Sequence, residues 1–171
     1  MTGASRRTSA EVPKEKSADG WLLPVLGRLI LVAGVIISAL DHSITQYGKF
    51  TITAFGIFGV ALFLAGLCLY AVARLTLGRL FSEIVRIKPE HRLITKGPYR
   101  IIRHPIYLGE ILIFLSIPII FCSLYGFIVM LALIPLLIHR ITIEEKVMSS
   151  RFGKEYEEYA RKTKKLIPYI Y

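Results

Sequence analysis

Cysteine is scarce in this chain of 171 residues. The two that it has, Cys68 and Cys122, lie in apolar runs, where a buried free thiol is the usual state. Two cysteines cannot form a disulfide framework, and these two lack the short spacing of metal-ligand pairs. The sequence therefore excludes a small disulfide-stabilised domain and a cysteine-based metal site.

Several motifs that identify soluble enzymes are also missing. The chain has no Gly-x-Gly-x-x-Gly, no Gly-x-Ser-x-Gly and no P-loop. These absences argue against a Rossmann-type dinucleotide domain and against the hydrolases and nucleotide-binding domains that carry the other two motifs. We expect no metal, because the four histidines lack the helical spacing of metal ligands. They are His42, His91, His104 and His139.

Apolar residues and positive charge are what the chain has in excess. Hydrophobic residues make up 54%, the mean hydropathy is +0.55, and the formal net charge is +10. A disordered chain needs low hydrophobicity, which is absent here. Apolar residues in runs of about twenty are typical of membrane spans. The composition predicts a small, one-domain integral membrane protein whose charge lies in a few segments outside the membrane.

Hydropathy predicts about four spans. Trp21–Leu40 and Ile52–Leu75 are each long enough for one. Ile106–His139 is too long for a single span and fits a tight hairpin of two short helices, with its turn near Cys122–Gly126. Prolines 118 and 135 should kink or shorten these two helices.

Division of the chain follows from these spans. We expect an all-α integral membrane protein with a flexible tail (1–20), two N-terminal helices (21–75) and a core (76–171). The core consists of a connector (76–105), the helical hairpin (106–139) and a C-terminal amphipathic helix (140–171) that breaks at Gly153.

Charge predicts the orientation. Residues 74–103 include eight basic and two acidic residues, and the tail from Arg140 includes eight basic and five acidic ones. Because cytoplasmic loops are rich in Lys and Arg, we expect both segments, and with four spans both termini, in the cytoplasm. Anionic headgroups account for positive charge beside spans, and no nucleic-acid motif is present. The expected partner is therefore a lipid bilayer and not a nucleic acid.

Residues 91–110 combine polar side chains with residues that break helices. Gly97-Pro98 marks a turn, and His104-Pro105 marks the start of a span, since the residue before proline avoids the helical region. Arg103, His104 and Tyr107 would then lie at the mouth of the membrane. The alternative is an interfacial belt, because such residues are common anchors at span ends.

A second polar group follows the last span. Arg140 and Glu144 would face the same side of a helix, and with Glu145 they lie near the bilayer edge, where ionisable groups usually have a partner or a ligand. The alternative is an ordinary surface ion pair, worth roughly 0.2–0.5 kcal/mol. Glu110, about one turn inside the third span, either faces these clusters or is merely interfacial.

The second half of the chain carries an ordered set of motifs: His-x-Leu-Ile, Gly-Pro-Tyr, Arg-His-Pro-x-Tyr-x-Gly, an apolar hairpin, Arg-x-x-x-Glu-Glu, Phe-Gly-x-x-Tyr-x-x-Tyr and a terminal proline. This order resembles the isoprenylcysteine carboxyl methyltransferase family, within a wider group that includes phospholipid N-methyltransferases. The resemblance covers roughly residues 76–171, and residues 1–75 match only in being membrane spans.

The resemblance implies a membrane enzyme that uses S-adenosylmethionine. Arg140 would face the methyl acceptor, Glu144 would bind the polar end of the cofactor, and Glu145 completes the acidic pair; these three are the expected catalytic residues. Gly109 would permit close approach. The expected cofactor-binding residues are His91, Leu93, Ile94, Tyr99, Arg103, His104, Pro105, Ile106, Tyr107 and Glu144. Carboxylates suit the donor's ammonium and ribose groups, and aromatic faces suit its cationic sulfur.

The acceptor is expected to be lipophilic, with O-methyl transfer to an isoprenylcysteine carboxylate first. Phospholipid N-methyl transfer and small-thiol S-methyl transfer are the alternatives. An NADPH-dependent sterol-type reductase shares the Arg-His-Pro-x-Tyr-x-Gly motif but not Arg-x-x-x-Glu-Glu, and a non-catalytic membrane adaptor would use the polar clusters as anchors. The short four-span form favours a prokaryotic plasma membrane over the endoplasmic reticulum.

Overall fold

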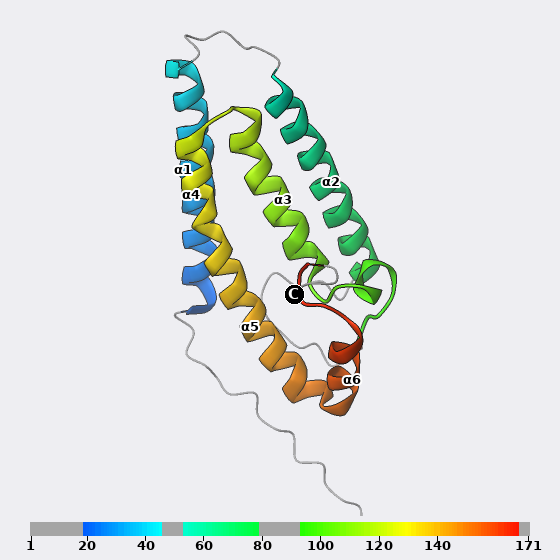
Figure 1. The fold of residues 1–171 in the computed structure, drawn as a ribbon. Helices are drawn as coiled ribbons and strands as arrows, with labels where there is room; N and C mark the ends of the chain where they lie inside the picture. The colour runs from blue at the N-terminus through cyan, green and yellow to red at the C-terminus, as the bar shows by residue number, and fades with distance from the viewer. Residues whose placement is uncertain (1–18, 46–52, 79–92, 168–171) are drawn as a thin grey trace, which may run out of the picture.

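The computed structural model describes residues 19–45, 53–78 and 93–167. In these ranges the chain is helical, and its one β-bridge lies outside any named strand. The elements, drawn in Figure 1, are α1 (Asp19–Thr45), α2 (Ala54–Leu77), the 3-10 turn η2 (Gly97–Arg100), α3 (Pro105–Ile120), α4 (Leu124–Leu131), α5 (Leu133–Phe152) and α6 (Lys154–Lys162). The predicted all-α class is confirmed.

Three helical segments are long and apolar enough to cross a membrane. They are Leu22–Thr45, Ala54–Leu77 and Leu124–Phe152, the last formed by α4 and α5 together. Large apolar side chains on these helices are exposed, among them Phe55 at 72% and Leu75 at 81%. Apolar surface of this extent suits lipid and not water. The chain is therefore a multi-pass membrane protein, and the expected third span, α3, is a shorter apolar helix of 16 residues.

The turn between α3 and α4 is shorter than the sequence predicts. It occupies residues 121–123, whereas the expected turn was Cys122–Gly126. The reason is a helix cap, because the Ser123 hydroxyl accepts a hydrogen bond from the Gly126 amide at 3.0 Å. A side chain that satisfies one of the first free amides lets the helix begin at the next residue.

Helix breaks on the C-terminal side follow proline and glycine. α4 and α5 are separated only at Ala132, one turn before Pro135, which has no amide hydrogen to donate to a carbonyl in that turn. α5 then continues through residue 140, where the sequence suggested a boundary, because nothing breaks the helix before Gly153. There the backbone takes a positive φ of 51°, which glycine adopts without strain, and α6 follows. The predicted break at Gly153 is confirmed.

Small residues let α2 and α3 approach closely. The buried residues of α2 are Gly59, Gly66 and Ala73, spaced by seven, and all lie against α3 or the start of it. A Cβ atom added to Gly66 would lie 2.9 Å from the carbonyl oxygen of Gly109, and one added to Gly109 would lie 2.9 Å from the amide nitrogen of Tyr70. Membrane helices commonly pack through such residues. Gly109 thus permits close approach of a helix.

α1 packs against α4 through small residues and also makes polar contacts near the α3–α4 turn. The Ser123 hydroxyl donates to Asp41 Oδ2 at 2.7 Å, and the Phe121 carbonyl lies 3.0 Å from His42 Nδ1. These contacts fasten the end of α1 to the α3–α4 turn. The helix pairs α2–α3 and α1–α4 lie side by side, and the opposite end of the bundle carries the start of α3, the lower part of α5, η2 and α6 (Figure 1).

Ser123→Ala should lower the free energy of unfolding by about 1–2 kcal/mol, because it removes both the cap and the bond to Asp41. Thermal unfolding in detergent measures this. Ser43→Ala is the control, since that exposed hydroxyl donates to the Ala39 carbonyl within α1. Equal losses in the two variants would contradict the role given to Ser123.

Candidate active site

Six polar and aromatic residues predicted as site residues meet where α3 begins and α5 passes it. The connector and the first turn of α3 supply three of them, and α5 supplies three. His104 precedes Pro105, whose fixed backbone starts α3, so the side chains on either side of this boundary are held in place. The six are Arg103, His104, Tyr107, Arg140, Glu144 and Glu145.

Glu144 is contacted from both helices. The Tyr107 hydroxyl donates a hydrogen bond to Glu144 Oε1. Arg140 Nε lies 3.7 Å from the same oxygen, and His104 Nδ1 lies 3.7 Å from Oε2. The Arg140 guanidinium carbon also lies 5.8 Å from the centroid of the Tyr107 ring. The predicted Arg140–Glu144 pair is therefore part of a larger cluster that α3 completes.

Glu145 faces different partners. Arg103 Nε donates to Glu145 Oε1 at 2.8 Å, and Lys165 Nζ lies 3.1 Å from Oε2. His104 Nε2 is 3.4 Å from Oε1, within ion-pair distance, and makes no hydrogen bond within the described structure. The neighbouring carboxylates thus differ: two cations neutralise Glu145, whereas Glu144 is held by a tyrosine and flanked by Arg140.

The segment after α6 binds the backbone of the connector. Lys164 pairs with Ile102 in a parallel bridge, and the His104 amide donates to the Lys165 carbonyl at 3.1 Å. Arg103 Nη1 donates to the carbonyls of Ala160 and Thr163 at 3.0 and 2.6 Å. Lys165 was missed by the sequence reasoning, because no spacing rule connects it to Glu145, twenty residues earlier.

Other predicted cofactor residues belong to the apolar core. Tyr99 and Ile106 are buried with Ala73, Ile94 packs against them, and Pro105 is fully buried. These residues support the connector through packing.

Aromatic residues of α6 join the connector to α5. The Tyr159 hydroxyl donates to the Tyr99 carbonyl at 2.8 Å, and burial raises the pKa of Tyr159 to about 12, so this donor keeps its proton at neutral pH. Tyr156 is buried close to Glu145. Burial and the negative charge of Glu145 both raise the pKa of the Tyr156 phenol. Through these contacts the two tyrosines hold α6 against the connector and α5.

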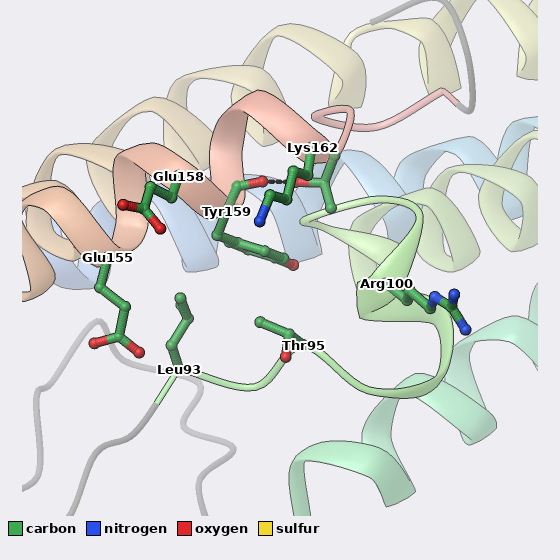
Figure 2. A pocket seen from close by; sticks show the side chains of 8 residues that line it. Leu93, Thr95, Arg100, Glu155, Glu158, Tyr159 and Lys162 are labelled. Carbon is green, nitrogen blue, oxygen red and sulfur yellow. Dashed lines mark hydrogen bonds between the residues drawn. The ribbon is translucent and has the colours of Figure 1, made fainter.

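An open pocket of about 440 Å³ lies between the connector and α6. Leu93 is the predicted cofactor residue that lines it, and Figure 2 shows its side chain on the side facing α6. His91 lies outside the described residues. The other lining residues are Thr95, Arg100, Glu155, Glu158, Tyr159, Lys162 and Thr163.

Glu110 belongs with the cluster. It follows Tyr107 by one turn of α3 and is close enough to Tyr107 and Arg140 to act electrostatically on both. Among the described residues, no three His, Cys, Asp or Glu side chains are arranged to hold a metal ion.

Fold and site together define a class: a multi-pass helical membrane protein with an ionisable cluster at one end of its bundle. The chain belongs to the isoprenylcysteine carboxyl methyltransferase (ICMT) family, whose sequence model matches residues 59–150.

Three known proteins illustrate the similarity. A probable protein-S-isoprenylcysteine O-methyltransferase of Oryza sativa subsp. indica is 34% identical over 115 residues, which are 66% of this chain and 60% of the rice protein. The solved structure of the eukaryotic intramembrane Ras methyltransferase ICMT superposes with a TM-score of 0.72 at 26% identity, over 81% of this chain and 52% of that one. A mouse Delta(14)-sterol reductase, TM7SF2, is 30% identical over 92 residues, covering 52% of this chain and 22% of the reductase. The chain thus spans about 60% of the rice relative's length.

Proposed function

We propose that this protein is an S-adenosylmethionine-dependent methyltransferase that methylates the carboxylate of an isoprenylcysteine-type lipophilic acceptor. One observation carries the proposal: in a chain of the ICMT family, Arg140 and Glu144 lie together against Tyr107 and His104 at the start of α3. This places a cation for an anionic acceptor directly beside a carboxylate and an aromatic ring for a cationic donor.

The residues present fit the cofactor. Glu144 is a half-buried carboxylate that suits the ammonium or ribose hydroxyls, and His104 Nε2 is a buried polar atom that makes no hydrogen bond within the described structure. When bound, the cofactor supplies a methyl group on a sulfonium, and an aromatic face such as that of Tyr107 suits this cation. Among the described cofactor residues only Leu93 lines the pocket between the connector and α6, which is of the size that small-molecule sites have.

Arg140 would orient the acceptor. A guanidinium binds a carboxylate through two parallel hydrogen bonds, which fixes the direction of attack. An ionised carboxylate is already a nucleophile and needs no base, so the protein's task is to align the reactants and exclude water. An amine or thiol acceptor would need a proton acceptor. Glu144 or His104 would serve better than Glu145, which two cations hold in its ionised form.

We propose that the charged end of the bundle faces the cytoplasm. Arg103, Arg140 and Lys165 gather at the end of the bundle that the positive charge assigns to the cytoplasm, which supports a cytoplasmic site and cytoplasmic termini. The proposed methyltransferase core consists of the connector, the hairpin and the C-terminal helix (76–171), with α1 and α2 as an N-terminal membrane unit. A prokaryotic membrane stays a prediction, since the relatives with a stated source are eukaryotic.

Ligand binding tests the proposal directly. Purified protein in detergent should bind S-adenosylhomocysteine in a calorimetric titration and should not bind NADPH at the same concentrations. Binding of NADPH alone would support the sterol-type reductase alternative. Binding of neither ligand by folded protein would contradict both enzymes and support a membrane adaptor.

The acceptor class can be read from the product. With labelled S-adenosylmethionine, S-farnesylcysteine bearing a free carboxylate should gain a methyl ester, which alkali releases as methanol. Phosphatidylethanolamine and an apolar thiol serve as competing acceptors, and their N-methyl and S-methyl products withstand alkali. Alkali-stable product alone would overturn the carboxylate assignment and keep the methyltransferase.

A further inference from the structure

Lys165 lies at the centre of the contact between the C-terminal segment and the site. Its Nζ is 3.1 Å from Glu145 Oε2, while Arg103 Nε binds the other oxygen at 2.8 Å. The Lys165 side chain is only 27% exposed and that of Glu145 17%, so solvent screens this contact less than it would screen a surface pair. Each oxygen of Glu145 therefore has its own cation, which fixes the plane of the carboxylate.

His104 links this carboxylate to the proposed cofactor site. Its side chain is 9% exposed and lies between the two glutamates, with Nε2 3.4 Å from Glu145 Oε1 and Nδ1 3.7 Å from Glu144 Oε2. The centroid of its ring also lies 5.8 Å from that of the Tyr107 ring, and the Tyr107 hydroxyl holds Glu144. A rotation of the Glu145 carboxylate would thus change the electrostatic environment of His104 and, through it, that of Glu144.

We propose that Lys165 is a positioning residue: through Glu145 it holds His104 beside Glu144 and makes the C-terminal segment part of the methyltransferase site. This inference rests on the proposed function. It also assigns Glu145 a different part from the catalytic one expected from the sequence, since the carboxylate acts through its neighbours.

Two physical effects support this role. The bridge between Ile102 and Lys164 fixes the backbone on both sides of Lys165, so its side chain needs little further ordering to reach Glu145. Without Lys165, Glu145 would carry less compensated negative charge next to Glu144, and like charges in a partly buried site repel strongly. Glu144 would then lie less favourably for the cofactor.

Lys164 provides a matched control. It is the neighbouring lysine, it takes part in the same backbone bridge, and its side chain is exposed. Lys164→Met therefore removes the same charge from the same segment without touching Glu145.

Three variants test the proposal: Lys165→Met, Lys165→Arg and Lys164→Met. In Lys165→Met we expect the Kd for S-adenosylhomocysteine to rise about fivefold and kcat to fall about tenfold, with the acceptor KM unchanged, because Arg140 keeps its place. Lys165→Arg should restore both values to within about threefold, and Lys164→Met should match the wild type. A role confined to stability would lower the thermal midpoint without changing the Kd of the folded protein, and would overturn the proposal.

A double-variant cycle tests the route through Glu145. Lys165→Met added to Glu145→Gln should cause little further loss, since the partner is already gone. Additive losses, or a Lys165→Met protein that behaves as wild type, would overturn the inference while wild-type binding of S-adenosylhomocysteine keeps the proposed function. A wild type that binds none would refute both. If Lys165→Met yields no folded protein, Lys165→Gln is measured in its place against the same expectations.

Discussion

Gly109→Leu should prevent α2 and α3 from packing, and little folded protein should be recovered. A Cβ atom at this position would lie 2.9 Å from the Tyr70 amide nitrogen and 3.0 Å from the Gly66 carbonyl oxygen. Both obstacles are helix backbone, which cannot move aside as a flexible side chain does. Overpacking a close-packed interface costs about 1–3 kcal/mol, and backbone contacts place this variant at or above the upper end. Detergent-solubilised yield, thermal unfolding and helix content measure the loss.

The control for this prediction is Gly27→Leu. Nothing lies within 4 Å of a Cβ atom added to Gly27 on α1, so the same change there should leave the thermal midpoint almost unchanged. Gly66→Ala, which faces the Gly109 carbonyl, should fall between the two. A Gly109→Leu protein that unfolds at the wild-type midpoint would show that α2 and α3 do not approach as closely as described.

The consequence for the site follows from the position of Gly109. It lies two residues after Tyr107 on the same helix, so a displaced α3 would carry Tyr107 and His104 away from Glu144. Loss of S-adenosylhomocysteine binding in any folded fraction of Gly109→Leu would therefore accompany the loss of stability.

Local signals in the sequence predicted much of this fold. Long apolar runs gave the spans, and the break at Gly153 was predicted because glycine alone takes the positive φ found there without strain. The α3–α4 turn was placed only approximately, since its end depends on the Ser123 cap, and a serine in an apolar run has other possible roles. The contacts of α2 with α3 and of α1 with α4 were not predicted. Gly59, Gly66 and Ala73 show which face of α2 is small, but nothing in the sequence says that α3 covers it.

The contacts of the site were likewise predicted only in part. Arg140 and Glu144 are four residues apart on one helix, so their contact is local and was predicted. Lys165 reaches Glu145 because the chain returns after α6 and pairs with the connector, which is a tertiary event without a sequence pattern. Tyr99 and Ile106 carry the family motif, yet their side chains are buried in the core, since a motif marks a position and not a contact.

Glu144 and Arg140 should separate cofactor binding from turnover. Glu144→Gln is expected to raise the Kd for S-adenosylhomocysteine at least tenfold (about 1.4 kcal/mol), because a neutral amide cannot attract the ammonium as a carboxylate does. Arg140→Met should leave that Kd within about threefold and lower kcat about a hundredfold (about 2.7 kcal/mol), because the acceptor carboxylate loses its orienting guanidinium. Calorimetry gives the first quantity, and transfer of labelled methyl to S-farnesylcysteine gives the second.

Thr142→Ala is the matched control for both variants, since this exposed residue of α5 lies between the two and its hydroxyl donates to the Ile138 carbonyl of its own helix. It should bind and turn over as the wild type does. The separation depends on geometry: Arg140 Nε and Glu144 Oε1 are 3.7 Å apart, close enough for each to serve a different reactant, and the Tyr107 hydroxyl keeps Glu144 in place when Arg140 is removed. Equal loss of cofactor affinity in Glu144→Gln and Arg140→Met would show that the two residues act on one ligand as a unit. The acceptor would then have to be oriented by another group, and Arg103, which already serves Glu145 and two backbone carbonyls, is poorly placed for that role.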